Sequence, residues 1–138
     1  MNNLSHDISV LLVEDPDLNL TAGGNLFVGR EPTSPPNTVT LFDSPGGGPA
    51  HFYDREERYE YGAIQVRVRD THYGNGLLRA RAISKVLDGI SGIEIDGALY
   101  TRIRAIDNPS LLGYDDNNRA WIVFNLETQR RPLPQEQT

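Results

Sequence analysis

The stretch AIQVRVRDTHYGNGLLRARAISK, from Ala63 to Lys85, carries a strand pattern followed by a helix pattern. Residues 63–69 alternate between apolar and polar side chains, which is the period of a strand with one buried face. The apolar side chains are Ile64, Val66 and Val68, and the polar ones are Gln65, Arg67 and Arg69. We therefore expect a half-buried strand whose other face carries two arginines.

After this strand, Tyr73–Gly76 predicts a turn, and the residues up to Asp88 predict an amphipathic helix. The apolar arc of this helix holds Ala80, Ala82, Ile83, Val86, Leu87 and Ile90, while Arg81, Ser84, Lys85 and Asp88 lie opposite. Arg79 is the exception, because its direction falls within the apolar arc. Either its stem packs while the guanidinium reaches solvent, or it pairs with a carboxylate of another element or subunit.

A second helix is predicted near the N-terminus. Leu4, Ile8, Leu11 and Leu12 repeat at helical spacing, with Asn3 or Ser5 as the N-cap. Pro16 ends the pattern. Residues 25–32 and 37–44 are rich in β-formers and predict two short strands, separated by prolines.

Residues 45–61, PGGGPAHFYDREERYEY, combine a Gly/Pro hinge with mixed charges and aromatic side chains. We expect a long loop here. It is either a solvated, disordered loop or an arm that binds a partner, because tyrosine and arginine are enriched where proteins meet. Under the second interpretation its contact residues are Tyr53, Arg55, Arg58, Tyr59 and Tyr61.

The segment GIEIDGALYTRIRAI, Gly92–Ile106, predicts a hairpin with its turn at Asp96 and Gly97. In its second strand Leu99, Thr101, Ile103 and Ala105 are expected to face one way, and Tyr100, Arg102 and Arg104 the other. This repeats the pattern of Arg67 and Arg69. We interpret the alternating arginines, together with Arg79, as an interface between subunits or as a solvated face whose arginines pair across strands with acids such as Glu127.

A polar loop over 107–120 and a final strand over 121–130 complete the chain. The pattern predicts an α+β fold, with a mostly antiparallel sheet of about four to six strands packed against an N-terminal helix and a central helix. Residues 1–131 are expected to form a single domain that includes the 45–61 loop, and 132–138 a disordered C-terminal tail.

The composition limits the partners. A net charge of −6 disfavours tight nonspecific binding of nucleic acid, which requires Lys and Arg contacts to phosphates. The absence of cysteine excludes disulfides, thiolate zinc sites and a cysteine nucleophile. No apolar run is long enough for a membrane span, and no signal peptide is expected.

No catalytic, metal-binding or cofactor-binding motif is present. His6, His51 and His72 lie in separate regions, and Gly46–Gly48 lacks the Lys-Ser/Thr of a phosphate-binding loop. We therefore expect a binding or structural protein without cofactor. The alternative is a small enzyme or ligand-binding domain with its pocket beside Gly74–Gly76, using Asp70 and His72.

Two blocks carry a resemblance to a known family: YEYGAIQVRVRDTHYGNGLLRARAISKVLDGI, and IEIDGALYTRIRAIDNPSLLGYDDNNRAWIVFNLE. The order of a QVRVR strand, a Gly-containing turn, an amphipathic helix, a hairpin, an LG-x-D-x-N-x-R loop and a final F-x-L strand resembles the tail terminator or minor capsid proteins of bacteriophages with long, non-contractile tails. The resemblance covers roughly residues 26–131.

This resemblance implies a structural protein of the virion, located at the neck of the tail and assembled in the host cytoplasm. Its subunits would form a ring, a hexamer, that caps the tail tube, stops tail polymerisation and binds a head completion or connector protein. DNA would pass through the ring without specific binding. An alternative within the same particle is a head-to-tail connector or a tail tube subunit.

Overall fold

The computed structural model describes residues 3–51 and 58–133, and the side chains of all of these except 45–51 and 58. Its helices are α1 (Leu4–Glu14) and α2 (Tyr73–Leu87). Its strands are β1 (Leu26–Val28), β2 (Thr38–His51), β3 (Arg58–Asp70), β4 (Ile93–Ile95), β5 (Ala98–Ala105), β6 (Ser110–Tyr114) and β7 (Ala120–Pro132). The α+β class is confirmed.

The seven strands of the described chain form one sheet in the order β1-β2-β3-β7-β5-β4, and β6 pairs with the free part of the β7 edge. Every pair is antiparallel except β1 with β2. The sheet is thus one strand larger than the expected upper limit. The additional strand is β6, which lies where the sequence predicts a polar loop.

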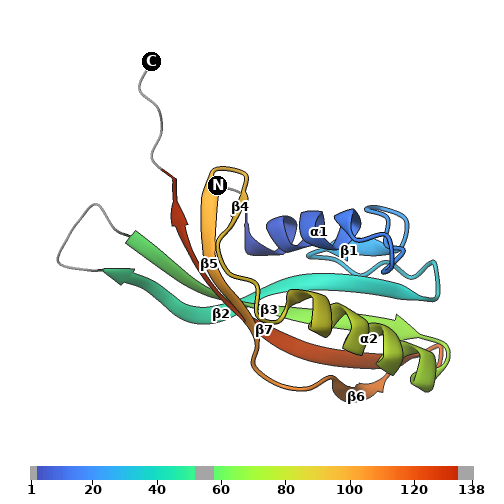
Figure 1. Cartoon of the computed structure of the whole chain (residues 1–138). Coiled ribbons are helices and arrows are strands. Elements are labelled where there is room, and N and C mark those ends of the chain that lie inside the picture. Colours follow the sequence, from blue (N-terminus) through green and yellow to red (C-terminus); the bar gives the residue numbers. More distant parts are fainter. Residues whose placement is uncertain (1–2, 52–57, 134–138) are drawn as a thin grey trace.

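Both helices cover the same face of the sheet (Figure 1). On β3 and β7 the buried side chains are directly opposite each other, as in the pair Val66 and Phe124. Together with Ile8 of α1 and Ile83 of α2, all fully buried, they belong to a single hydrophobic core. The opposite face of the sheet, called the outer face below, carries the odd-numbered residues of β3 and β7.

Helix α1 begins and ends as predicted. The Asn3 side chain accepts a hydrogen bond from the His6 backbone N–H at 3.2 Å and so acts as the N-cap. The Asp43 carboxylate on β2 accepts from the Ser5 N–H at 3.1 Å, which joins the helix start to the sheet. The helix ends at Glu14, before Pro16.

Helix α2 begins earlier than predicted, because Tyr73–Gly76 forms its first turn. Glycine has low helix propensity, yet packing favours it here. A Cβ on Gly76 would lie 2.6 Å from Ile122 Cδ1 on β7 and 3.0 Å from the Asp70 Cβ. Close approach of helix and sheet therefore requires glycine, and this long-range contact is not visible in the local pattern.

The prediction of a loop over 45–61 is wrong for most of that range, because residues 45–51 extend β2 and residues 58–61 begin β3. The two strands form a long hairpin that projects beyond the rest of the sheet (Figure 1). The ladder is irregular between Ser44 and Gly48, where the glycines lie, and beyond Leu41 the other edge of β2 pairs with no described strand. An edge tolerates proline and a bulge tolerates glycine, which explains how this sequence forms a strand.

The β4–β5 hairpin turns at Asp96 and Gly97, as predicted, both with positive φ. The expected side-chain alternation along β5 is wrong at one point. The register shifts between Tyr100 and Arg102, so Tyr100 lies on the helix-covered face and is fully buried, whereas Arg102 is exposed. A bulge places an extra residue in one strand and exchanges its faces.

The C-terminal strand extends further than predicted. Pro132 belongs to β7, and the Leu133 N–H donates to the Gly97 carbonyl oxygen at 2.9 Å. The prediction of a disordered tail over 132–138 is therefore wrong for Pro132 and Leu133. Residues 134–138 lie outside the described residues.

Candidate interaction surfaces

Arg69 is buried, although the strand pattern predicts exposure. Its side chain is 3% exposed and its Nη1 donates to Glu31 Oε1 at 2.8 Å. Its other nitrogens donate to the carbonyl oxygens of Pro36 at 3.1 Å and Pro35 at 2.8 Å. Arg69 thus holds the β1–β2 connection against the outer face, and its part in an interface stays a prediction.

Arg67 lies on the outer face between two aromatic rings. Its guanidinium carbon is 5.0 Å from the centroid of Phe42 and 5.2 Å from that of Trp121. Its Nη2 donates to Gln65 Oε1 at 3.3 Å. These cation–π contacts stabilise the sheet, and Arg67 as a whole residue is half-buried.

Arg102 and Arg104 share the outer face on β5. Arg104 forms a cross-strand ion pair with Glu127 of β7 at 3.0 Å, the partner that the sequence predicts, and the two side chains are 45% and 40% exposed. Arg102 is exposed and has no ion pair with a described residue. Of these two arginines, only Arg102 lacks an ion-pair partner among the described residues, and the part of both in an interface stays a prediction.

The aromatic residues of the β2–β3 hairpin are only partly described. Tyr53 and Arg55 lie outside the described residues, and Arg58 begins β3 without a described side chain. Tyr59 is half-buried, and Tyr61 accepts a hydrogen bond from Gln129 Nε2 at 3.2 Å on the outer face. Their part in an interface stays a prediction.

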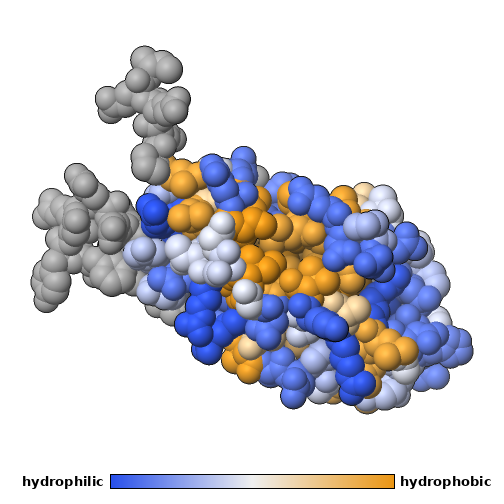
Figure 2. All heavy atoms as spheres, viewed as in Figure 1, coloured by the Kyte–Doolittle hydropathy of each residue, from blue (hydrophilic) through white to orange (hydrophobic). Residues whose placement is uncertain are grey.

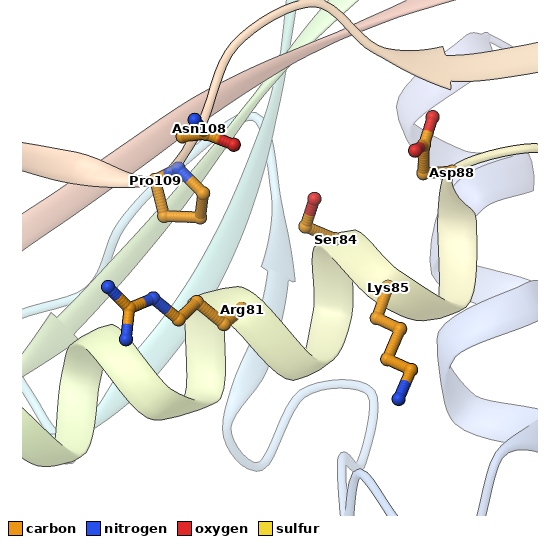
Figure 3. Close-up of a pocket in the computed structure, with 6 residues that line it drawn as sticks. All are labelled: Arg81, Ser84, Lys85, Asp88, Asn108 and Pro109. Atoms are coloured by element: carbon orange, nitrogen blue, oxygen red, sulfur yellow. The ribbon is translucent and has the colours of Figure 1, made fainter.

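Helix α2 carries three cations that pair with no described carboxylate. Arg79 is half-buried, which favours the interpretation that its stem packs, and Arg81 and Lys85 are exposed. An open hollow of about 650 Å³, called the α2 hollow, lies between this helix and the β5–β6 connection (Figure 3). It is lined by Arg81, Ser84, Lys85, Asp88, Asn108 and Pro109.

Asp88 is the only carboxylate lining the α2 hollow, and its Oδ1 accepts a hydrogen bond from the Ala105 N–H at 2.9 Å. The guanidinium of Arg81 and the ammonium of Lys85 point in different directions from the helix (Figure 3). The lining of the hollow thus carries two cations and one carboxylate.

A second hollow, of about 350 Å³, opens at the end of the sheet, and the sequence gives no sign of it. We call it the Glu31 pocket. It is lined by Glu31, Pro32, Thr33, Arg69, Tyr114, Asp115, Asp116, Asn117, Arg119 and Trp121. Its parts come from the β1–β2 connection, the end of β3 and the β6–β7 turn, so only the fold brings them together.

Two ion pairs build the walls of this pocket. Glu31 Oε1 accepts from Arg69 and also from Trp121 Nε1 at 2.9 Å. Arg119 Nε donates to Asp115 Oδ2 at 2.7 Å, and its Nη1 donates to the Thr33 carbonyl at 2.7 Å. Burial acts to raise the pKa of Asp115, but hydrogen bonds from the Arg119 backbone and guanidinium outweigh it and hold that pKa below its usual value.

A buried polar network on the helix-covered face also escapes sequence reasoning. Arg130 donates to Asp7 Oδ2 at 3.1 Å, to the Tyr100 hydroxyl at 3.0 Å and to Glu60 Oε2 at 3.0 Å. The Tyr100 hydroxyl also donates to Asp7. Burial raises the pKa of Tyr100, and the Asp7 carboxylate raises it further. This network ties α1 to β3, β5 and β7 and serves stability.

Exposed apolar side chains occur on α2 and β6. Leu78 of α2 is 64% exposed, and Leu111, Leu112 and Tyr114 of β6 are 42–54% exposed. Figure 2 shows a further hydrophobic area between α1 and α2. The partly buried Leu11 of α1 and Val86 of α2 pack against the core.

Asp70 and His72, the alternative ligand site, lie at the start of α2. Asp70 Oδ1 accepts a hydrogen bond from the His72 N–H at 2.8 Å, which is a structural role at a helix start. Neither the α2 hollow nor the Glu31 pocket is lined by these residues. Among the described side chains no three His, Asp or Glu residues gather as a metal site.

A family model described as bacteriophage tail terminator protein matches residues 7–131 of the sequence. The chain belongs to the bacteriophage tail terminator family. The resemblance seen in the sequence is thereby confirmed, and the protein is a virion-associated structural protein of the tail. Membership in this family also implies association with other virion proteins.

Solved structures share the fold of this tail terminator family member. A chain of the virion of a native gene transfer agent particle superposes with a TM-score of 0.69 at 14% identity, covering 92% of this chain and 93% of that one. A second solved protein gives a TM-score of 0.55 at 14% identity, covering 96% of this chain and 100% of its own. A search of curated proteins finds no match. Neither helix of the described chain is long and apolar enough to span a membrane.

Proposed function

We propose that this protein forms a ring, a hexamer, that caps the tail tube at the neck of the virion, stops tail polymerisation and binds the head completion or connector protein. The observation that carries this proposal is the family match over residues 7–131. The ring requires contacts in which one surface of a subunit meets a different surface of the next. We place the protein in the host cytoplasm during assembly and in the virion afterwards, as a single domain without a catalytic role.

Different surfaces of the chain could serve such contacts. The α2 hollow offers Arg81 and Lys85 without ion-pair partners among the described residues, and Arg102 is exposed on the outer face. The β2–β3 hairpin projects beyond the sheet (Figure 1), which supports its proposed role as an arm that contacts a neighbour. The net charge of −6 supports DNA passage without specific binding, because phosphates are repelled by an acidic ring.

The proposal is tested with purified protein and purified tail tubes. Mass photometry measures the oligomeric state, and electron microscopy shows whether the protein binds tube ends. We expect rings, alone or on the tube, and tubes that no longer elongate when tube subunits are added. A protein that remains monomeric and leaves tube ends free would contradict the proposal, and one that itself polymerises into tubes would identify a tube subunit.

A further inference from the structure

The Glu31 pocket has an acceptor without a donor. Glu31 Oε1 is shared by Arg69 and Trp121, but Oε2 is buried and has no hydrogen-bond partner in the described chain. The Glu31 side chain is 11% exposed. A buried carboxylate oxygen without a donor is unfavourable by about 1–3 kcal/mol or more, so this oxygen is expected to acquire a donor when the pocket is filled.

The charges around the pocket are also unbalanced. Three carboxylates line it, those of Glu31, Asp115 and Asp116, against the two guanidinium groups of Arg69 and Arg119. Arg69 already donates to Glu31, and Arg119 already donates to Asp115. Each guanidinium group also donates to a carbonyl oxygen of the β1–β2 connection. One negative charge therefore remains. Arg67 stacks on Trp121 but donates to Gln65 and does not line the pocket.

The aromatic lining of the pocket favours a flat cation. Tyr114 lines it and is 54% exposed, so its ring can receive a planar group. An arginine side chain combines hydrogen-bond donors for carboxylate oxygens with a flat face that stacks on aromatic rings, whereas lysine provides only a point charge. The chain itself is rich in arginine, and Arg102 is exposed on a strand and unpaired among the described residues.

We propose that the Glu31 pocket is a binding site for an arginine side chain of a neighbouring copy of this protein. The guanidinium of that arginine donates to Glu31 Oε2 and stacks on Tyr114. Its positive charge neutralises the excess negative charge of the pocket, to which Asp116 contributes. This inference rests on the proposed ring, because the ring brings copies next to each other. It adds that hydrogen bonds, charge neutralisation and stacking of an arginine side chain hold neighbouring copies together.

The chain provides its own probe of the pocket, because Trp121 is its single tryptophan and lines the site. Trp121 emission is measured during titration with arginine amide, and with lysine amide at equal ionic strength. We expect a saturable change with arginine amide and a much smaller one with lysine amide. In Asp116→Asn and Tyr114→Leu the midpoint should rise roughly two- to fivefold. Asp17→Asn, which removes an exposed acid outside the pocket, is the matched control and should leave it unchanged.

The same variants test the neighbouring copy as the source of the arginine. In wild-type rings, acrylamide should quench Trp121 less than in monomers, and Asp116→Asn should raise the concentration for half-maximal ring formation roughly two- to fivefold relative to Asp17→Asn. Glu31→Gln is not used alone, because it also removes the partner of buried Arg69.

The outcomes separate the two proposals. No saturable response to arginine amide, or rings of Asp116→Asn that form like those of Asp17→Asn, would overturn the arginine site while the ring stands. A wild-type protein that binds arginine amide but never forms rings would overturn the proposed function and, with it, the neighbouring copy as the donor.

Discussion

Arg130, near the end of the last strand, donates to the fully buried carboxylate of Asp7 in the first helix at 3.1 Å. The two ends of the described chain are therefore joined by an ion pair beneath α1. The Tyr100 hydroxyl completes this contact from β5. Removing one member of a buried pair leaves the other charge uncompensated.

Asp7→Ala should lower the free energy of unfolding by about 3–5 kcal/mol, because buried Arg130 then loses the fully buried carboxylate that it pairs with. Urea unfolding followed by circular dichroism measures this change. The matched control is Glu127→Ala, which removes a carboxylate that pairs with Arg104 in an exposed position. It should change stability by less than about 1 kcal/mol. Equal effects of the two substitutions would contradict the structural role of the buried network.

The raised pKa of Tyr100 predicts a loss of stability in alkali. A tyrosine in the unfolded chain loses its proton near pH 10, whereas folded Tyr100 keeps it to higher pH. The unfolded state therefore binds fewer protons above pH 10, and the free energy of unfolding falls as the pH rises. Tyr100→Phe should show a shallower decline than wild type in urea unfolding between pH 9 and about 11. Identical slopes would show that Tyr100 titrates alike in both states.

Gly76→Ala should destabilise the protein by about 1–3 kcal/mol, because the new Cβ would lie 2.6 Å from Ile122 Cδ1 and force α2 away from β7. Gly74→Ala, in the same helical turn, is the matched control, because a Cβ there meets nothing within 4 Å. It should stabilise α2 by up to about 1 kcal/mol through better helix propensity. Thermal unfolding of both variants measures this difference, and a Gly76→Ala protein as stable as Gly74→Ala would contradict the described packing.

Arg102→Glu should impair ring assembly while changing stability by no more than about 0.5 kcal/mol, because the side chain is exposed and makes no ion pair with a described residue. Arg67→Glu should lower both, since it removes contacts with Phe42 and Trp121 that contribute about 0.5–2 kcal/mol. Mass photometry and thermal unfolding of each variant provide the two readouts. Normal assembly of Arg102→Glu would remove Arg102 from the interface.

Local patterns predicted the elements whose signals are local. The N-cap at Asn3, the alternation from Ala63 to Arg69, and the Asp96–Gly97 turn each depend on a few adjacent residues, and each is present. The α+β class follows from these elements. The family resemblance depends on their order along the chain.

The remaining features depend on contacts between distant residues. The local pattern predicts a turn at Gly76, and only the packing against Ile122 of β7 explains a glycine within the helix. The strand pattern predicts that Arg69 is exposed, and only the ion pair with distant Glu31 explains its burial. The bulge beside Arg102 exchanges the faces of β5, and β6 forms only because β7 leaves part of its edge free. The Glu31 pocket joins three segments and has no motif in the sequence.

We propose that this protein ends the growth of the tail, and tail length is the quantity that this activity controls. Particles from a phage that lacks this gene are examined by electron microscopy, with the gene supplied in trans as the control. We expect abnormally long tails without the gene and tails of normal length when it is restored. Heads without tails, together with free tails of normal length, would show that the protein is not a terminator and would indicate a connector.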